Sequence, residues 1–236
     1  MTGKFKINLL LIAFLVTAFV YLFSKDKKMR PTTDPGKNDH EPVVVTEAEK
    51  TYLLTLARQT LDGYLKDKKV PDVDKSKLSE RLTAKKGCFV TLTRKDTGLR
   101  GCIGHIFPVK PLYQSVMECA ISSAVHDSRF HPVTHKELRD IRISLSVLTV
   151  PADLAFTSPQ DLLNKLIPLK HGVVLKTRYG SSTFLPQVWG DLPDKRQFLS
   201  RLCMKHGAPA DEWEKEKIKV QTYQAVVFKE NNFGGN

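Results

Sequence analysis

A cysteine, an arginine and two glycines fall close together in the segment LRGCIGH. Cys102 follows Arg100 by two positions, with Gly101 before it and Gly104 after it. On an extended chain, residues two apart point the same way, so the guanidinium would lie near the sulfur and favour the nucleophilic thiolate. The glycines would allow tight turns or close approach of a backbone or ligand. Cys102 is therefore a candidate nucleophile; the alternative is a small buried side chain in crowded packing.

A base for this thiol could come from either of two histidines. His171 lies in the segment KHGVV, and His105 lies three residues after the cysteine. No Cys-His-Asn or Cys-His-Asp order in the chain specifies such a site. The sequence therefore makes Cys102 and His171 candidate catalytic residues and leaves the catalytic role open.

The segment HDSRF supplies a second candidate group. Asp127 falls at the C-terminal end of a predicted helix and could anchor a turn. Arg129 could bind a carboxylate or phosphate through two hydrogen bonds, or pair internally with Asp127 or Asp140, and most such pairs are structural. In TFLPQV, the Gln187 amide could bind a ligand or satisfy a neighbouring turn. We expect a binding cleft formed by Arg100, Gly101, Gly104, Asp127, Arg129 and Gln187.

The histidines at 126, 131 and 135 do not indicate a metal site. Pro132 would interrupt a helix that carried His131 and His135 on one face. No carboxylate or thiol lies at a matching spacing. The sequence predicts neither a metal nor a cofactor.

Helices and strands that could position these residues alternate along the chain. Thr46 and Glu49 have the spacing of a capping box, and apolar residues then recur at helical intervals. We expect helices over 46–69, 111–127, 158–166 and 194–207, and strands over 87–94, 99–107, 141–149, 171–180 and 217–228. This order predicts an α+β fold with a mostly antiparallel sheet and packed helices.

Composition narrows the classes of partner. The formal net charge is +12, but the basic residues are mixed with acidic ones, as on solvated surfaces. No platform for base readout or stacking is visible, so nucleic acid is not an expected partner. The four cysteines form no CxxC pair, which favours a reducing compartment.

The first residues resemble a membrane segment. Ile7 to Phe23 is uncharged and mostly apolar, and as a helix would be about 25 Å long. We predict a single-pass anchor in residues 1–24, with a cleaved signal peptide and export as the alternative. The basic residues that follow favour a cytoplasmic domain. We further expect a flexible tether over 25–45, a domain over 46–230 and a disordered tail over 231–236.

Several segments together resemble the AMMECR domain family. They are GCFVTLTR, LRGCIGH, SSAVHDSRF, ISLSVLT, KHGVVLK, TFLPQVW and FLSRLCMKHG. The resemblance spans about Thr46 to Phe228 and implies an α+β fold of two lobes with a cleft between them. It also implies a place beside Memo-type and radical-SAM proteins, as the A component of the AmmeMemoRadiSam system. His105 departs from the family pattern, where threonine is common, as do Ser128 and His131, where prolines are common.

Two functional hypotheses follow. The first is a membrane-tethered binding or scaffold module that docks a Memo-like or radical-SAM partner. The second is an enzyme or enzyme subunit with Cys102 as nucleophile or redox thiol on a small anionic or amide substrate. The reactivity of Cys102 distinguishes the two.

Overall fold

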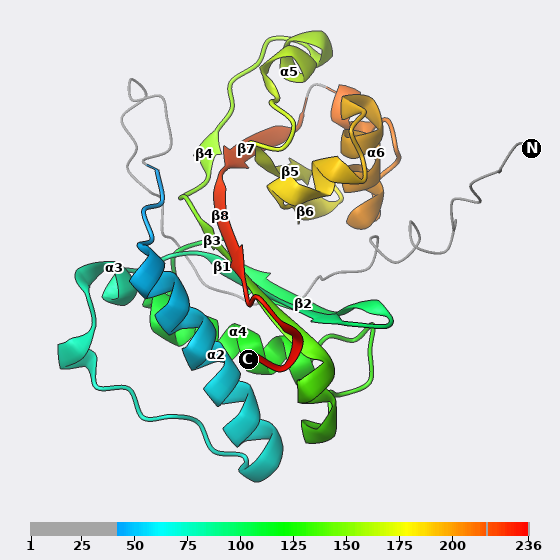
Figure 1. The fold of residues 1–236 in the computed structure, drawn as a ribbon. Coiled ribbons are helices and arrows are strands. Elements are labelled where there is room, and N and C mark those ends of the chain that lie inside the picture. Colours follow the sequence, from blue (N-terminus) through cyan, green and yellow to red (C-terminus); the bar gives the residue numbers. More distant parts are fainter. Residues whose placement is uncertain (1–41, 216, 236) are drawn as a thin grey trace, which may run out of the picture.

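Two antiparallel sheets organise the chain, and helices cover each of them (Figure 1). The computed structural model describes residues 42–215 and 217–235. The first sheet has the order β2-β1-β3-β8 and the second has the order β4-β7-β5-β6. The strands are β1 (Cys88–Arg94), β2 (Gly98–His105), β3 (Ile141–Leu148), β4 (Ala152–Asp153), β5 (Gly172–Thr177), β6 (Gly180–Phe184), β7 (Lys219–Tyr223) and β8 (Ala225–Lys229). The predicted α+β class with mostly antiparallel pairing is confirmed.

The first lobe packs two long helices on its sheet. The helices α2 (Glu47–Asp67) and α4 (Leu112–Val125) lie on the same side of the sheet, and the short α3 (Glu80–Thr83) lies beside them (Figure 1). The predicted capping box is present, since Thr46 Oγ1 accepts from Glu49 N at 3.2 Å and Glu49 Oε2 accepts from Thr46 N at 2.9 Å. Leu53, Ala57 and Leu61 then point into the core at four-residue spacing.

The second lobe has a core of its own. It contains α5 (Pro159–Lys165) and α6 (Lys195–Lys205), and its buried cluster includes Val173, Leu175 and Phe198. The rings of Trp189 and Phe198 stack with centroids 3.6 Å apart. A third cluster of Leu148, Val174 and Tyr223, with Phe89 and Ile106 against it, joins the two lobes. Five short 3-10 turns complete the described chain: Lys75–Lys77, His135–Asp140, Pro186–Gly190, Glu212–Glu214 and Phe233–Gly235.

The last strand predicted from the sequence is in fact two. The expected strand over 217–228 breaks at Gln224, so β7 joins the second sheet and β8 joins the first (Figure 1). At the break, Gln224 N donates to Thr149 Oγ1 at 2.9 Å and Thr149 N donates to Gln224 O at 3.0 Å. These bonds tie together the two points at which the chain crosses between lobes. Hydrophobic alternation alone could not place that crossing.

The two ends of the predicted domain also differ from expectation. The apolar segment and most of the tether lie outside the described residues, but Val43 and Val45 pack on the first-lobe core. Across the described ranges, no helix has both the length and the apolar character needed to span a membrane. The predicted disordered tail requires correction at Phe233–Gly235, which forms a turn with the Phe233 ring 4.9 Å from the Arg142 guanidinium.

Candidate functional site

The glycines of LRGCIGH let parts of this chain approach one another. A Cβ atom on Gly101 would lie 2.0 Å from Ser123 O of α4. One on Gly104 would lie 2.4 Å from Cγ of Phe89. Ser123 Oγ accepts from Ile103 N at 2.8 Å and donates to Val90 O at 2.8 Å, which fixes α4 on the β1–β2 hairpin. The close approach that the glycines predicted is thus an approach of other parts of this chain.

Cys102 lies on the face of the hairpin that is turned away from α4. It pairs across the strands with Thr91, whose Oγ1 donates to the Cys102 sulfur at 3.3 Å. Its backbone N–H donates to Asp127 Oδ2 at 2.8 Å. Asp127 also accepts from Arg129 Nε at 2.9 Å and Nη2 at 2.6 Å, and both side chains are about 5% exposed or less. Arg129 therefore makes the internal pair, and that pair positions the Cys102 backbone.

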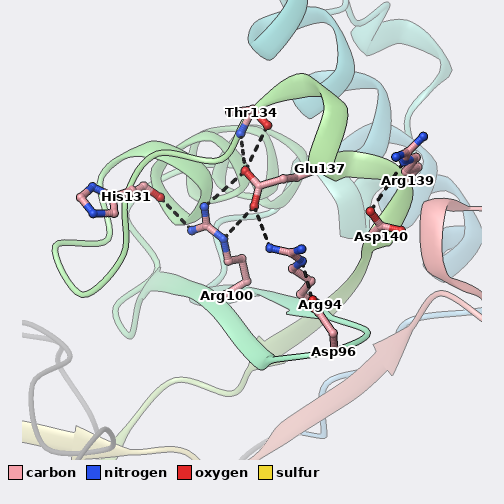
Figure 2. A network of polar contacts seen from close by, with 8 residues as sticks. All are labelled: Arg94, Asp96, Arg100, His131, Thr134, Glu137, Arg139 and Asp140. Carbon is pink, nitrogen blue, oxygen red and sulfur yellow. Dashed lines mark hydrogen bonds and ion pairs between the residues drawn. The ribbon is translucent and has the colours of Figure 1, made fainter.

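Arg100 does not supply the positive charge beside the thiol. Its Nε lies 3.2 Å from Glu137 Oε1 and its Nη1 donates to His131 O at 2.8 Å (Figure 2). Glu137 is held by Thr134 N at 2.8 Å and also lies 3.6 Å from Arg94 Nη1. Figure 2 shows Arg94, Arg100 and Thr134 converging on the Glu137 carboxylate. The expected approach of the Arg100 guanidinium to the Cys102 sulfur is not found. The β1–β2 pairing shifts register beside Arg100, and its guanidinium pairs with Glu137 instead.

A positive charge that acts on the Cys102 thiol comes from Lys205, at the end of α6 in the other lobe. The sequence did not single out this residue. Its Nζ donates to Thr183 O at 2.8 Å and lies 4.9 Å from the centroid of the Phe184 ring. Burial lowers the pKa of Lys205 to about 8, and its charge interacts with the Cys102 sulfur and with Arg129. Nothing in the segment CMKHG distinguishes this lysine from a surface one.

Tyr223 of β7 completes the arrangement from the second lobe. Its hydroxyl donates to Phe184 O at 3.1 Å and lies 2.8 Å from Thr183 Oγ1. Burial raises the pKa of Tyr223, and its charge would also interact with the Cys102 sulfur. A Cβ on Gly172 would lie 2.4 Å from the Tyr223 ring, so Gly172 leaves the space that this ring occupies. Because its pKa is raised, the Tyr223 phenol is neutral at neutral pH.

The Cys102 thiol is protonated in this environment. Burial raises the pKa of Cys102 above its usual value, and the hydrogen bond from Thr91 and the charges of Arg129 and Lys205 offset that rise only in part. The nearby charge of Asp127 raises it further. A reaction at this sulfur would therefore need a group that accepts its proton.

The other predicted residues lie elsewhere. His171 is buried before β5, where its Nδ1 accepts from Ile167 N at 3.2 Å and its carbonyl accepts from Trp189 Nε1 at 2.7 Å. Gln187 Nε2 donates to Ser146 Oγ of β3 at 3.1 Å, so this amide bridges the two lobes. Over 42–215 and 217–235, no three His, Cys, Asp or Glu side chains are grouped so as to hold a metal ion.

Comparison with known proteins identifies relatives along most of the chain. The family model described as AMMECR1 matches residues 54–228. Protein MK0488 of Methanopyrus kandleri is 36% identical over 193 residues, which are 79% of this chain and 90% of that protein. Protein PYRAB00100 of Pyrococcus abyssi is 38% identical over 186 residues, which are 76% of this chain and 89% of that protein.

A solved structure supports the same assignment. The crystal structure of uncharacterized protein PH0010 from Pyrococcus horikoshii matches with a TM-score of 0.76 and 34% identity, covering 81% of this chain and 96% of that one. Sequence and fold therefore agree, and the chain belongs to the AMMECR1 family.

Proposed function

We propose that the chain is an enzyme or enzyme subunit that uses the Cys102 thiol on a small anionic acyl or amide substrate, with Lys205 as its acid–base partner. The observation that carries this proposal is a half-buried lysine in one lobe, whose Nζ is held by Thr183 O and the Phe184 ring and whose charge acts on the half-buried Cys102 thiol in the other. A lysine held away from solvent costs stability, and perturbed groups of this kind cluster at functional sites. Lys205 takes the role that we first gave to His171.

The reaction needs no group beyond those present. The Cys102 sulfur attacks the carbonyl carbon of the substrate, and its proton passes to the neutral amine of Lys205. The bond to the leaving group breaks as that group takes the proton from Lys205, which leaves a thioester on Cys102. Water then hydrolyses the thioester and regenerates the thiol. With a pKa of about 8, Lys205 can both accept and donate a proton near neutral pH.

Acetyl transfer from p-nitrophenyl acetate tests this proposal on the full-length chain. Release of p-nitrophenolate is followed by absorbance, and acetylation of Cys102 is followed by mass spectrometry. We expect Cys102→Ser to remove the acetylated species and Lys205→Met to slow its formation by about tenfold or more, as for loss of an acid–base group. The wild-type rate should rise as pH passes through about 8, where Lys205 loses its proton.

Lys195 provides a matched control on the same helix. Its Nζ also donates to a backbone carbonyl, that of Leu163, at 2.6 Å. Lys195→Met should leave acetylation of Cys102 unchanged. Equal acetylation rates in Lys205→Met and wild type would refute the role of Lys205.

A second candidate is a binding or scaffold module, tethered to the cytoplasmic face of a membrane by residues 1–24, that docks a Memo-like or radical-SAM partner. The observation that favours it is the state of Cys102, whose pKa is raised and whose N–H is already bound to Asp127. The site then offers neither a thiolate nor a free backbone donor.

Co-purification distinguishes this candidate from the enzyme. A tagged full-length chain and its Cys102→Ser variant would be mixed with a purified Memo-type or radical-SAM protein. Equal capture by both, without acetyl transfer in the wild type, would favour the module. Membrane fractionation of the chain with and without residues 1–24 tests the tether, and loss of 1–24 from the mature protein would instead indicate export.

A further inference from the structure

A second thiol group lies on the opposite face of the β1–β2 hairpin, against α4. Cys88 pairs directly with His105 across the two strands, so both side chains point to the helix side. Ser115 and Cys119 lie one turn apart on α4, on the face that meets them. His105 Nε2 lies 3.1 Å from Ser115 Oγ, and its Nδ1 lies 3.7 Å from the Cys119 sulfur. The imidazole thus bridges a hydroxyl and a thiol.

The two thiols of this group lie against the same imidazole. Cys88 is its cross-strand neighbour, Cys119 lies 3.7 Å from its Nδ1, and both cysteines belong to one buried cluster. Cys88 is fully buried, whereas Cys119 is 5% exposed and His105 is half-buried. A nucleophile beside a base that a third group orients is the arrangement that activates a thiol. Here a second thiol, Cys88, lies beside the same imidazole.

The environment favours a thiolate on Cys119. Hydrogen bonding from Cys88 and then from His105 lowers the pKa of Cys119 to about 6, although burial and the Glu118 carboxylate act in the opposite direction. The pKa of Cys88 is raised, because its proton is held in that hydrogen bond and because it is buried. The titratable groups with the largest effect on the Cys119 pKa are Cys88 from β1, His105 from β2 and Glu118 from α4 itself.

We propose that Cys119 and Cys88 form an oxidant-responsive dithiol site, in which Cys119 reacts with a hydroperoxide and Cys88 resolves the product as an intramolecular disulfide. The Cys119 thiolate attacks one oxygen of hydrogen peroxide, the O–O bond breaks, and the departing hydroxide takes a proton from solvent to leave as water, which gives a sulfenic acid. The Cys88 thiol then attacks this sulfur, a second water leaves, and the disulfide forms. His105 positions the thiolate. The site is separate from Cys102, which faces the other lobe.

Oxidation of the full-length chain by hydrogen peroxide, followed by alkylation of the remaining thiols and digestion without reductant, tests the site. We expect residues 87–94 to become linked to the peptide that carries Cys119. Trypsin leaves Cys102 and Cys119 on one peptide, because Pro111 follows Lys110. Cys102→Ser is therefore used in parallel and must still give the link. If Cys102→Ser gives no such disulfide link while the wild type gives one through Cys102, the proposal is overturned.

Two variants separate the roles. Cys88→Ser should leave a Cys119 sulfenic acid that dimedone traps, and failure to trap it would overturn the role of Cys119. His105→Gln should slow disulfide formation at pH 7 by about tenfold, as expected when a thiol loses a hydrogen bond that lowers its pKa. An unchanged rate in a folded His105→Gln variant would overturn the role of His105.

Two further measurements use the wild-type chain and therefore do not depend on whether a variant folds. Its rate of disulfide formation should level at a pH below the usual thiol pKa of about 8.5, because the pKa of Cys119 is lowered. A rate that climbs to pH 9 would contradict the proposal. Cys203 is buried in the second lobe with its pKa raised to about 11, and it should stay reduced. Equal oxidation of Cys203 would mean that unfolding exposes all the thiols.

Discussion

The pKa values of the cysteines on the two faces of the β1–β2 hairpin shift in opposite directions. Cys102, on the face toward the second lobe, has a raised pKa although two cations act on it. Cys119, on α4 against the other face, has a lowered pKa with one histidine and one thiol beside it. Burial has the largest effect at Cys102, where one hydroxyl donates to the sulfur, whereas hydrogen bonds from Cys88 and His105 outweigh burial at Cys119. Strand alternation, which sends Cys88 and Thr91 to opposite sides, separates the two environments.

Of the substitutions that test this comparison, Asp127→Asn should cause the largest change, a loss of stability. The change leaves the buried Arg129 charge without its partner and weakens the bond to Cys102 N. Breaking a buried ion pair costs about 3–5 kcal/mol of unfolding free energy, measured by urea denaturation at pH 7. The pKa of Asp127 is lowered in the fold, so its contribution is present above about pH 4 and is lost as pH falls through the folded value.

The exposed aspartate Asp62 provides the control for this change. It pairs with His135 at 2.8 Å and its side chain is 60% exposed. Asp62→Asn should change stability by no more than about 0.5 kcal/mol. A similar loss in both variants would show that Asp127 does not organise the Cys102 face.

Gly101→Ala should have the next largest effect. The new methyl group would lie 2.0 Å from Ser123 O, so α4 and β2 must separate. Overpacking of this kind costs about 1–3 kcal/mol, and the stability can be measured by thermal unfolding. Gly190 is the control, because a Cβ there meets nothing within 4 Å. If Gly101→Ala were as stable as Gly190→Ala, the hairpin would not need its close contact with α4.

The two thiols can be compared directly in one molecule. At pH 7, Cys119 should react with hydrogen peroxide about tenfold faster than Cys102, a difference of about 1.4 kcal/mol in activation free energy. The ratio follows from the larger thiolate fraction of Cys119, reduced by its burial. Dimedone labelling in the Cys88→Ser background, read on peptides cut between the two residues, gives the ratio. Faster labelling of Cys102 would reverse the comparison.

The smallest expected effect is a gain in stability. Lys205→Met removes a buried charge but also its bond to Thr183, so the melting temperature at pH 7 should rise by roughly 2 °C. The folded pKa of about 8 lies below the usual value of 10.5, so the unfolded chain binds more protons between these values and wild-type stability rises with pH there. The difference in melting temperature between Lys205→Met and the wild type should therefore shrink toward pH 10.5. A lower melting temperature than that of Lys195→Met would show that Lys205 is structural.

Local patterns in the sequence were sufficient for most of the elements. The capping box at Thr46, the alternation over β3 and the Ser158 cap of α5 depend on neighbouring residues, and each is present in the fold. Pattern reasoning missed β6 and joined β7 to β8. The short β6 has little apolar alternation, and the break at Gln224 depends on Thr149, which is distant in the chain.

The sequence by itself determined the family, the α+β class and the need for glycines beside Cys102. Tertiary structure alone decided which groups meet the sulfurs. The charge of Lys205 acts on Cys102 from another lobe, Glu137 pairs with Arg100, and His105 contacts Cys119 through helix packing. The physical reason is that acidity depends on burial and on the nearest polar atoms, and those are set by contacts between residues that lie far apart along the chain.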